Sequence, residues 1–272
     1  MIRVEWVRQV RRIRTWACLA MLATVPVIIT VASYLDPPRR RRFDLNLFTI
    51  LTSSGINVGL IALVVMSQFF LVVVVAAFAG ESVSGEATWG TLRYLLVRPV
   101  SRAKLILAKL TVAYVLTLIA IVFIVGAGLI SGTIAFGWHD ATAIQQTRLF
   151  PLPVSVPIGE ALGRLGLASA YVALTMLAVV AIGIFLSTLT DSTAAAVVST
   201  VVVVVASQVL TAVPSLSSIK PLLPTRYWDE WRNLFLGGTT HDMWKGVASA
   251  IAFTVIFCVA ALVRFRRKDI LS

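Results

Sequence analysis

Six apolar runs, each long enough to cross a lipid bilayer, constrain the fold of this chain more than any other feature of its sequence. A membrane-spanning helix needs roughly 20 mostly apolar residues to cross a hydrocarbon core about 30 Å thick. Of the 272 residues, 58% are hydrophobic and 13% are charged, a balance typical of membrane proteins. The sequence therefore predicts an all-α membrane protein that forms a single transmembrane domain over residues 1–272. The predicted spans are 15–35, 56–80, 110–136, 167–189, 193–213 and 247–263.

None of these six runs contains Asp, Glu, Lys or Arg. Ion-coupled carriers and membrane enzymes usually place ionisable groups at membrane depth, so this composition disfavours both classes. Cys18 and Cys258 lie inside predicted spans, and His139 and His241 lie far apart in the sequence without a cysteine cluster. This spacing predicts no metal site. We also expect no catalytic residue, no cofactor and no nucleic-acid partner.

The distribution of basic residues predicts the orientation of the chain. With six spans, both termini lie on one side, together with the loop at 81–109; that side carries fourteen of the 24 Lys and Arg residues. Because basic residues accumulate on the cytoplasmic side, the termini and this loop are predicted to be cytoplasmic. The run Arg39-Arg40-Arg41-Arg42 then falls outside, contrary to the rule. It is interpreted either as arginines that reach the outer headgroups or as a sign of misplaced first spans.

Two segments are predicted to lie at the membrane surface. In 1–14, apolar residues recur at helical spacing and arginines lie mostly on the other faces, which is typical of an interfacial helix. In 214–246, Pro224 suits a helix start and aromatic residues follow at spacings of three and four, which predicts a short re-entrant or interfacial helix before the last span. The alternatives are a plain basic anchor for the first segment and an ordinary aromatic anchor for the second.

Smaller features predict helix ends and helix packing. Ser101 suits the N-cap of the third span, and either Asp191 or Ser192 suits the N-cap of the fifth, which makes spans four and five an antiparallel hairpin. Three glycines in the third span are predicted to allow close helix packing or bending: Gly126, Gly128 and Gly132.

Two polar pairs interrupt the apolar spans, Ser67-Gln68 in the second and Ser207-Gln208 in the fifth. A glutamine amide in hydrocarbon must find hydrogen-bond partners on another helix or in a wet cavity. One interpretation is therefore interhelical hydrogen bonding. The other is that these residues line a path for a transported molecule.

The segment GEATWGTLRYLLVRPVSRAKLILAK, residues 85–109, has more charge than a plain connector between spans requires. Its apolar residues share one helical face, and Pro99 ends that helix. The apolar face comprises Trp89, Leu92, Leu95 and Leu96. The sequence predicts a short cytoplasmic helix over 85–102; the alternative is a basic anchor with a helix stop.

This segment resembles the cytoplasmic loop of the ABC-2-type exporter permeases, in particular those of the bacitracin-resistance-like branch. The resemblance rests on Glu86, Gly90-Thr91-Leu92-Arg93, Leu95-Leu96, Pro99-Val100-Ser101-Arg102 and Lys109. Glu5, the pair Thr15-Trp16, the number of spans and the basic tail add to it, so it covers nearly the whole chain. Glu81 offers a second acidic residue beside Glu86.

The resemblance implies a non-catalytic permease subunit in the bacterial cytoplasmic membrane, surrounded by lipid and working in antibiotic resistance or other export. It implies pairing with a second permease copy or paralogue and with two ATP-binding cassette ATPase subunits on separate chains, which bind the ATP and Mg. The cargo would be an amphipathic drug, an antibiotic or a lipid-like molecule. The alternative is an ATP-independent membrane protein: an ion-coupled carrier, a membrane enzyme or an assembly factor.

The resemblance implies that the 85–102 helix is a coupling helix that docks on the ATPase. We expect Glu86, Arg93 and Arg98 at the rim of that contact. The positions implied are Glu86, Trp89, Gly90, Thr91, Leu92, Arg93, Leu96, Arg98, Pro99 and Arg102. Spans two and five would line the permease interface, which places Ser67, Gln68, Ser207 and Gln208 on the substrate pathway. Independently, none of the five lysines follows a glycine, so the chain lacks a phosphate-binding loop.

Overall fold

The computed structural model describes residues 2–35, 51–88, 101–146, 151–216, 219–236 and 240–267. Helices dominate these ranges, as predicted. Five helices are long and apolar enough to span a membrane, or six if the bent pair α4 and α5 counts as one span. The helices are α1 (Ile2–Val10), α2 (Ile13–Leu35), α4 (Gly55–Gln68), α5 (Phe70–Thr88), α7 (Arg102–Phe136), α8 (Ile158–Leu189), α9 (Thr193–Ala212), α10 (Asn233–Leu236) and α11 (Met243–Arg267).

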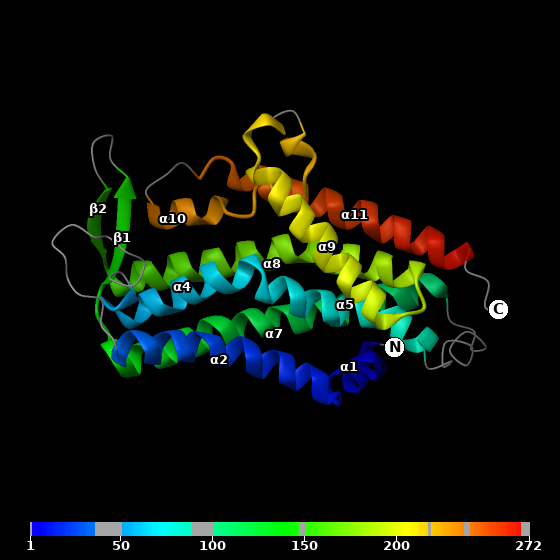
Figure 1. Ribbon diagram of the computed structural model, residues 1–272, viewed down its shortest axis with the longest axis horizontal. Helices are drawn as coiled ribbons and strands as arrows, with labels where there is room; N and C mark the ends of the chain where they lie inside the picture. The colour runs from blue at the N-terminus through cyan, green and yellow to red at the C-terminus, as the bar shows by residue number, and fades with distance from the viewer. Residues whose placement is uncertain are drawn as a thin grey trace.

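The long helices lie roughly along a common axis, with α8 enclosed by the others (Figure 1). It packs against α5, α7, α9 and α11, and α7 in turn packs against α2 and α4. Most residues of α8 are buried, whereas α2, α9 and α11 present many apolar side chains to the outside, as a lipid-facing helix does. The end of α5, the start of α7 and α1 meet at one end of the bundle, and the β hairpin lies at the opposite end (Figure 1).

Helices α7 and α8 are longer than their predicted spans because helical structure continues past the apolar runs. Helix α7 has 35 residues and α8 has 32, so at about 1.5 Å per residue both exceed the thickness of the hydrocarbon core. Ser101 caps α7 by accepting a hydrogen bond from the Lys104 amide, and Ser192 caps α9 by accepting one from the Ala195 amide. Both predicted caps are confirmed, with Ser192 rather than Asp191 in the second.

Helices α4 and α7 cross at close range through two pairs of glycines. A Cβ atom on Gly128 would lie 2.9 Å from the Gly59 Cα, and one on Gly132 would lie 2.6 Å from the Gly55 carbonyl oxygen. Glycine spaced by four residues on both helices allows this approach. The prediction of close packing is thus confirmed for Gly128 and Gly132, whereas a Cβ on Gly126 would meet nothing within 4 Å.

Two connections differ from their predictions. A two-stranded antiparallel sheet joins α7 to α8, with β1 (Ala141–Gln146) paired to β2 (Pro151–Val156), where no strand was predicted. The predicted helix beginning at Pro224 is wrong: turns occupy 224–229, followed by a 3-10 turn at Glu230–Arg232 and the single-turn helix α10. The aromatic spacing here serves packing instead, since Trp228, Trp231 and Phe235 are buried against the bundle.

Candidate functional site

A buried cluster of charged side chains joins α1, α5 and α7 at one end of the bundle. The Lys109 ammonium, whose side chain is 0% exposed, donates to the Glu86 carboxylate at 2.6 Å, to the Ser82 carbonyl at 2.6 Å and to the Glu5 carboxylate at 3.3 Å. Arg8 also binds Glu86 and lies 3.8 Å from Glu5. Three acceptors satisfy the three ammonium donors, and two carboxylates balance two cations. We call Glu5, Arg8, Glu86 and Lys109 the buried charge cluster.

This cluster corrects one expectation about Glu86. The residue was expected at the rim of a partner contact, but its side chain is 1% exposed and its bonds lie within the chain. Burial requires such pairing, because an isolated charge in a low-dielectric interior costs several kcal/mol. Glu86 can therefore affect a bound partner only by holding the end of α5 in position.

Glu81 forms a second link between the N-terminal segment and α5. It pairs with Arg12 at 3.0 Å and with Arg14. The corner between α1 and α2 is closed by Thr15, which donates to the Gln9 carbonyl at 2.8 Å, and by Trp16, which donates to the Val10 carbonyl at 2.8 Å. The Trp16 bond satisfies a carbonyl at the end of α1, and the Thr15 bond adds to the one that the Arg12 amide donates to the Gln9 carbonyl at 3.2 Å. Both acidic residues at the end of α5 thus bind the N-terminal segment.

Helix α1 turns two of its polar residues, Glu5 and Gln9, inward and leaves Arg3 exposed. Glu5 and Gln9 are buried, whereas Val4 and Val7 are exposed, as is Ile13 just beyond the helix. Most of the predicted apolar face therefore points away from the rest of the chain, where lipid would cover it, as in an interfacial helix, whereas Val10 packs against the core. The inward face carries Glu5 to Lys109.

The far side of the segment 89–100 is also anchored. Arg102, the first residue of α7, donates to the carbonyls of Phe265 and Arg266 at 2.9 and 2.8 Å, near the end of α11. Of the predicted coupling residues, the structure describes Glu86 and Arg102. Those that lie outside the described residues are Trp89, Gly90, Thr91, Leu92, Arg93, Leu96, Arg98 and Pro99.

The polar pairs come together at the break between α4 and α5. Gln68 donates to the Asp229 carboxylate at 2.7 Å, and Gln208 donates to the Gln68 carbonyl at 2.9 Å. Ser207 shares a hydrogen bond with Thr225 at 2.7 Å. Ser67 instead bonds the Val64 carbonyl of its own helix at 3.3 Å. In this structure each glutamine amide donates a hydrogen bond to a group on another element.

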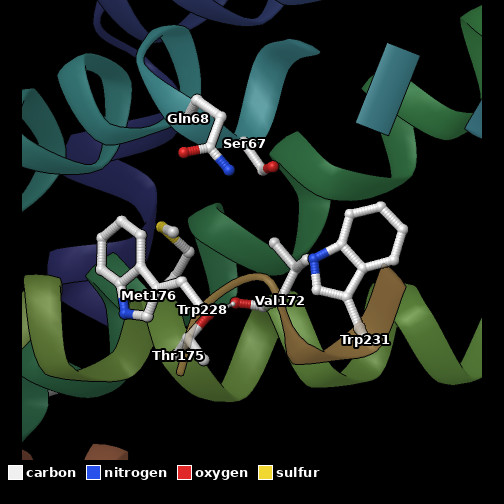
Figure 2. A pocket seen from close by; sticks show the side chains of 7 residues that line it. All are labelled: Ser67, Gln68, Val172, Thr175, Met176, Trp228 and Trp231. Atoms are coloured by element: carbon white, nitrogen blue, oxygen red, sulfur yellow. Dashed lines mark hydrogen bonds between the residues drawn. The ribbon is translucent and has the colours of Figure 1, made fainter. Parts of the chain in front are cut away.

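Figure 2 shows the pocket beside this break. Ser67 and Gln68 form one wall, three residues of α8 lie opposite, and Trp228 and Trp231 stand on either side. The residues from α8 are Val172, Thr175 and Met176. Their side chains fill the space so closely that no separate molecule fits. The Trp228 indole is buried, and within the described part of the chain its N–H has no hydrogen-bond partner.

Sequence reasoning missed part of each cluster. Glu5 and Lys109 were used only as marks of resemblance, although a single acid among five arginines and a lysine directly before a long apolar run both indicate buried pairing. Asp229 was assigned no role, and no local signal points to its partner 161 residues earlier. Among the described residues, no group of three or more His, Cys, Asp or Glu could hold a metal ion.

The fold and its two clusters define the chain as a multi-pass helical membrane protein with a charged joint at one end and a polar break within the bundle. The chain belongs to the DUF2705 family, described as proteins of unknown function, whose family model matches residues 18–271. No curated protein matches the chain.

Proposed function

We propose that this chain is the membrane-spanning permease subunit of an ATP-driven ABC exporter, working with ATPase subunits on separate chains in a bacterial cytoplasmic membrane. The observation that carries the proposal is the anchoring of both ends of the segment 89–100. Glu86, shortly before the segment, binds Lys109 and Arg8, and Arg102, shortly after it, binds the carbonyls of Phe265 and Arg266.

This anchoring suits a docking loop that transmits force. A push on the loop would reach α5 and α7 directly along the chain and would reach α1 and α11 through charged hydrogen bonds. Such bonds are shorter and stronger than neutral ones. A loop that only joined two spans would not need links to four helices. The sequence lacks the Gly-Lys-Ser/Thr motif of a phosphate-binding loop, which agrees with an ATPase on another chain.

The buried carboxylates also favour a second candidate, an ion-coupled carrier. Glu5 and Glu86 lie in the protein interior, although the predicted apolar runs contain no ionisable residue. Buried carboxylates of this kind are the groups that ion-coupled carriers use to bind the coupling ion. The two candidates differ in the energy source that each requires.

The experiment measures the ATPase activity that co-purifies with the tagged chain from the membranes of its own host. It compares this activity between the wild type and variants of the segment 89–100. Expected results are ATP hydrolysis with the wild type and its loss or uncoupling in Leu92→Asp and Arg93→Ala at unchanged membrane levels. The matched control is Ser155→Ala, an exposed position in the hairpin at the other end.

Two results would contradict the permease proposal. Hydrolysis by the isolated, contaminant-free chain would place the motor within it. Uptake or export by the reconstituted chain that follows a proton gradient without ATP would instead support the ion-coupled carrier.

A further inference from the structure

No proline or glycine accounts for the break between α4 and α5. Helix α4 ends at Gln68 and α5 begins at Phe70, and their axes differ by 54°. Sharp bends usually occur at proline, at glycine, or where a side chain enters the backbone hydrogen-bond ladder. Residues 60–79 contain neither proline nor glycine. Two side chains contact the backbone ladder beside the break: Ser67 donates to the Val64 carbonyl at 3.3 Å, and the Gln208 amide donates to the Gln68 carbonyl at 2.9 Å.

Gln68 also holds the segment 224–232 over this break. Its amide donates to the Asp229 carboxylate at 2.7 Å, and Asp229 pairs with Arg232 at 3.0 Å. The Asp229 side chain is 53% exposed, so water can compete for this bond. One residue thus links α4, α9 and the segment 224–232.

The same segment lines the pocket between α4 and α8. Trp228 and Trp231 flank the pocket (Figure 2). Tyr171 of α8 donates to the Tyr227 carbonyl at 2.6 Å. Thr225 bonds Ser207 on α9. Thr175, one of the α8 residues on the opposite wall, is 2% exposed. If the segment moved away, Thr175 would meet solvent.

We propose that Gln68 is a latch: its bond to Asp229 holds the segment 224–232 against the α4–α5 break, and release of this bond opens the pocket to solvent. Phe69 is the pivot between the two half-helices. The role of the latch in transport rests on the proposed function, whereas its opening requires neither cargo nor ATPase. The latch and the transport function can therefore fail separately.

The test measures how fast a small thiol reagent labels Thr175→Cys in the purified full chain, with Cys18 and Cys258 replaced by Ala. We expect slow labelling with Gln68 in place. Gln68→Glu places a second carboxylate beside that of Asp229, so the two repel each other and the labelling rate should rise at least tenfold. Gln68→Leu, which removes the bond without adding a charge, should raise it at least threefold.

An exchange of donor and acceptor gives the sharpest control. In Gln68→Glu combined with Asp229→Asn, the new amide can donate to the new carboxylate, so slow labelling should return. A second reporter, Thr117→Cys, is fully buried in α7 and should label slowly in every variant. Unchanged Thr175→Cys labelling in Gln68→Glu and Gln68→Leu would overturn the latch. Equal acceleration at Thr117→Cys would also overturn it, because it would indicate general loosening rather than local opening.

Discussion

At the scale of single residues, Lys109 shows how a charge can be buried at the end of an apolar helix. Its ammonium is removed from water completely, and the loss of hydration is offset by two carboxylates and one carbonyl. The cluster is also balanced in charge, so removal of one member leaves an excess charge in the interior. Glu86 therefore has a structural role, because it joins α5 to α7 through Lys109. It affects the position of the segment 89–100 only through this contact.

We expect Lys109→Met to lower the free energy of unfolding by about 3 to 5 kcal/mol, the usual effect of breaking a buried ion pair from one side. The measurement is the apparent melting temperature of the purified chain in detergent. Lys104→Met, one helical turn or so earlier at an exposed position, is the matched control and should melt like the wild type.

The double variant Lys109→Met with Glu86→Gln removes one charge of each sign and should lose less stability than Lys109→Met alone. Equal melting of Lys109→Met and Lys104→Met would show that the buried charge cluster does not hold the three helices together.

At the scale of elements, the crossing of α4 and α7 depends on the absence of side chains at four positions. Their backbones approach so closely that a methyl group on either helix meets the other. Without a hydrophobic effect between helices inside a bilayer, such contact is a main source of their association. The crossing sets the direction of α4, and hence the direction from which α4 reaches the break at Gln68.

We expect Gly132→Ala to destabilise the chain by about 1 to 3 kcal/mol, since its methyl group would lie 2.6 Å from the Gly55 carbonyl oxygen and 2.7 Å from the Val58 side chain. Gly126→Ala on the same helix has open space and should leave stability unchanged or slightly higher. The apparent melting temperatures of the two variants test this contrast. Similar values for both would rule out the crossing as a tight contact.

At the scale of the whole molecule, the two ends of the bundle have different chemistry. One end gathers the charged residues of α1, α5 and the start of α7, and the other carries the hairpin (Figure 1). Fourteen of the 24 basic residues belong to the set of segments that includes both termini, so we propose that the charged end is cytoplasmic.

Cysteine labelling in intact cells tests this orientation, with Cys18 and Cys258 replaced. Ser155→Cys in the hairpin region and Lys104→Cys at the charged end both occupy exposed positions. We expect a membrane-impermeant reagent to label Ser155→Cys in intact cells and Lys104→Cys only after the cells are opened. The reverse pattern would place the charged end outside.

The sequence by itself determined the features that depend on neighbouring residues. Apolar length predicted the membrane-spanning helices, and serine before a helix predicted the caps at Ser101 and Ser192, because hydration and capping act within a few residues. The spacing of Gly128 and Gly132 likewise indicated a close contact, although not with which helix. The aromatic spacing after Pro224 was misleading, since it reflects burial against α8 rather than a helix.

Only the tertiary structure decided which polar groups satisfy one another. Lys109 pairs not only with Glu86 but also with Glu5, 104 residues away, and the bend after Gln68 coincides with a bond from Gln208, 140 residues away. The expected position of Glu86 at a rim was wrong for the same reason. Burial depends on what packs against a side chain, and its helical face alone does not show this. Partners this distant leave no local pattern, since the cost of burying a charge or an amide is offset wherever the fold brings its partner.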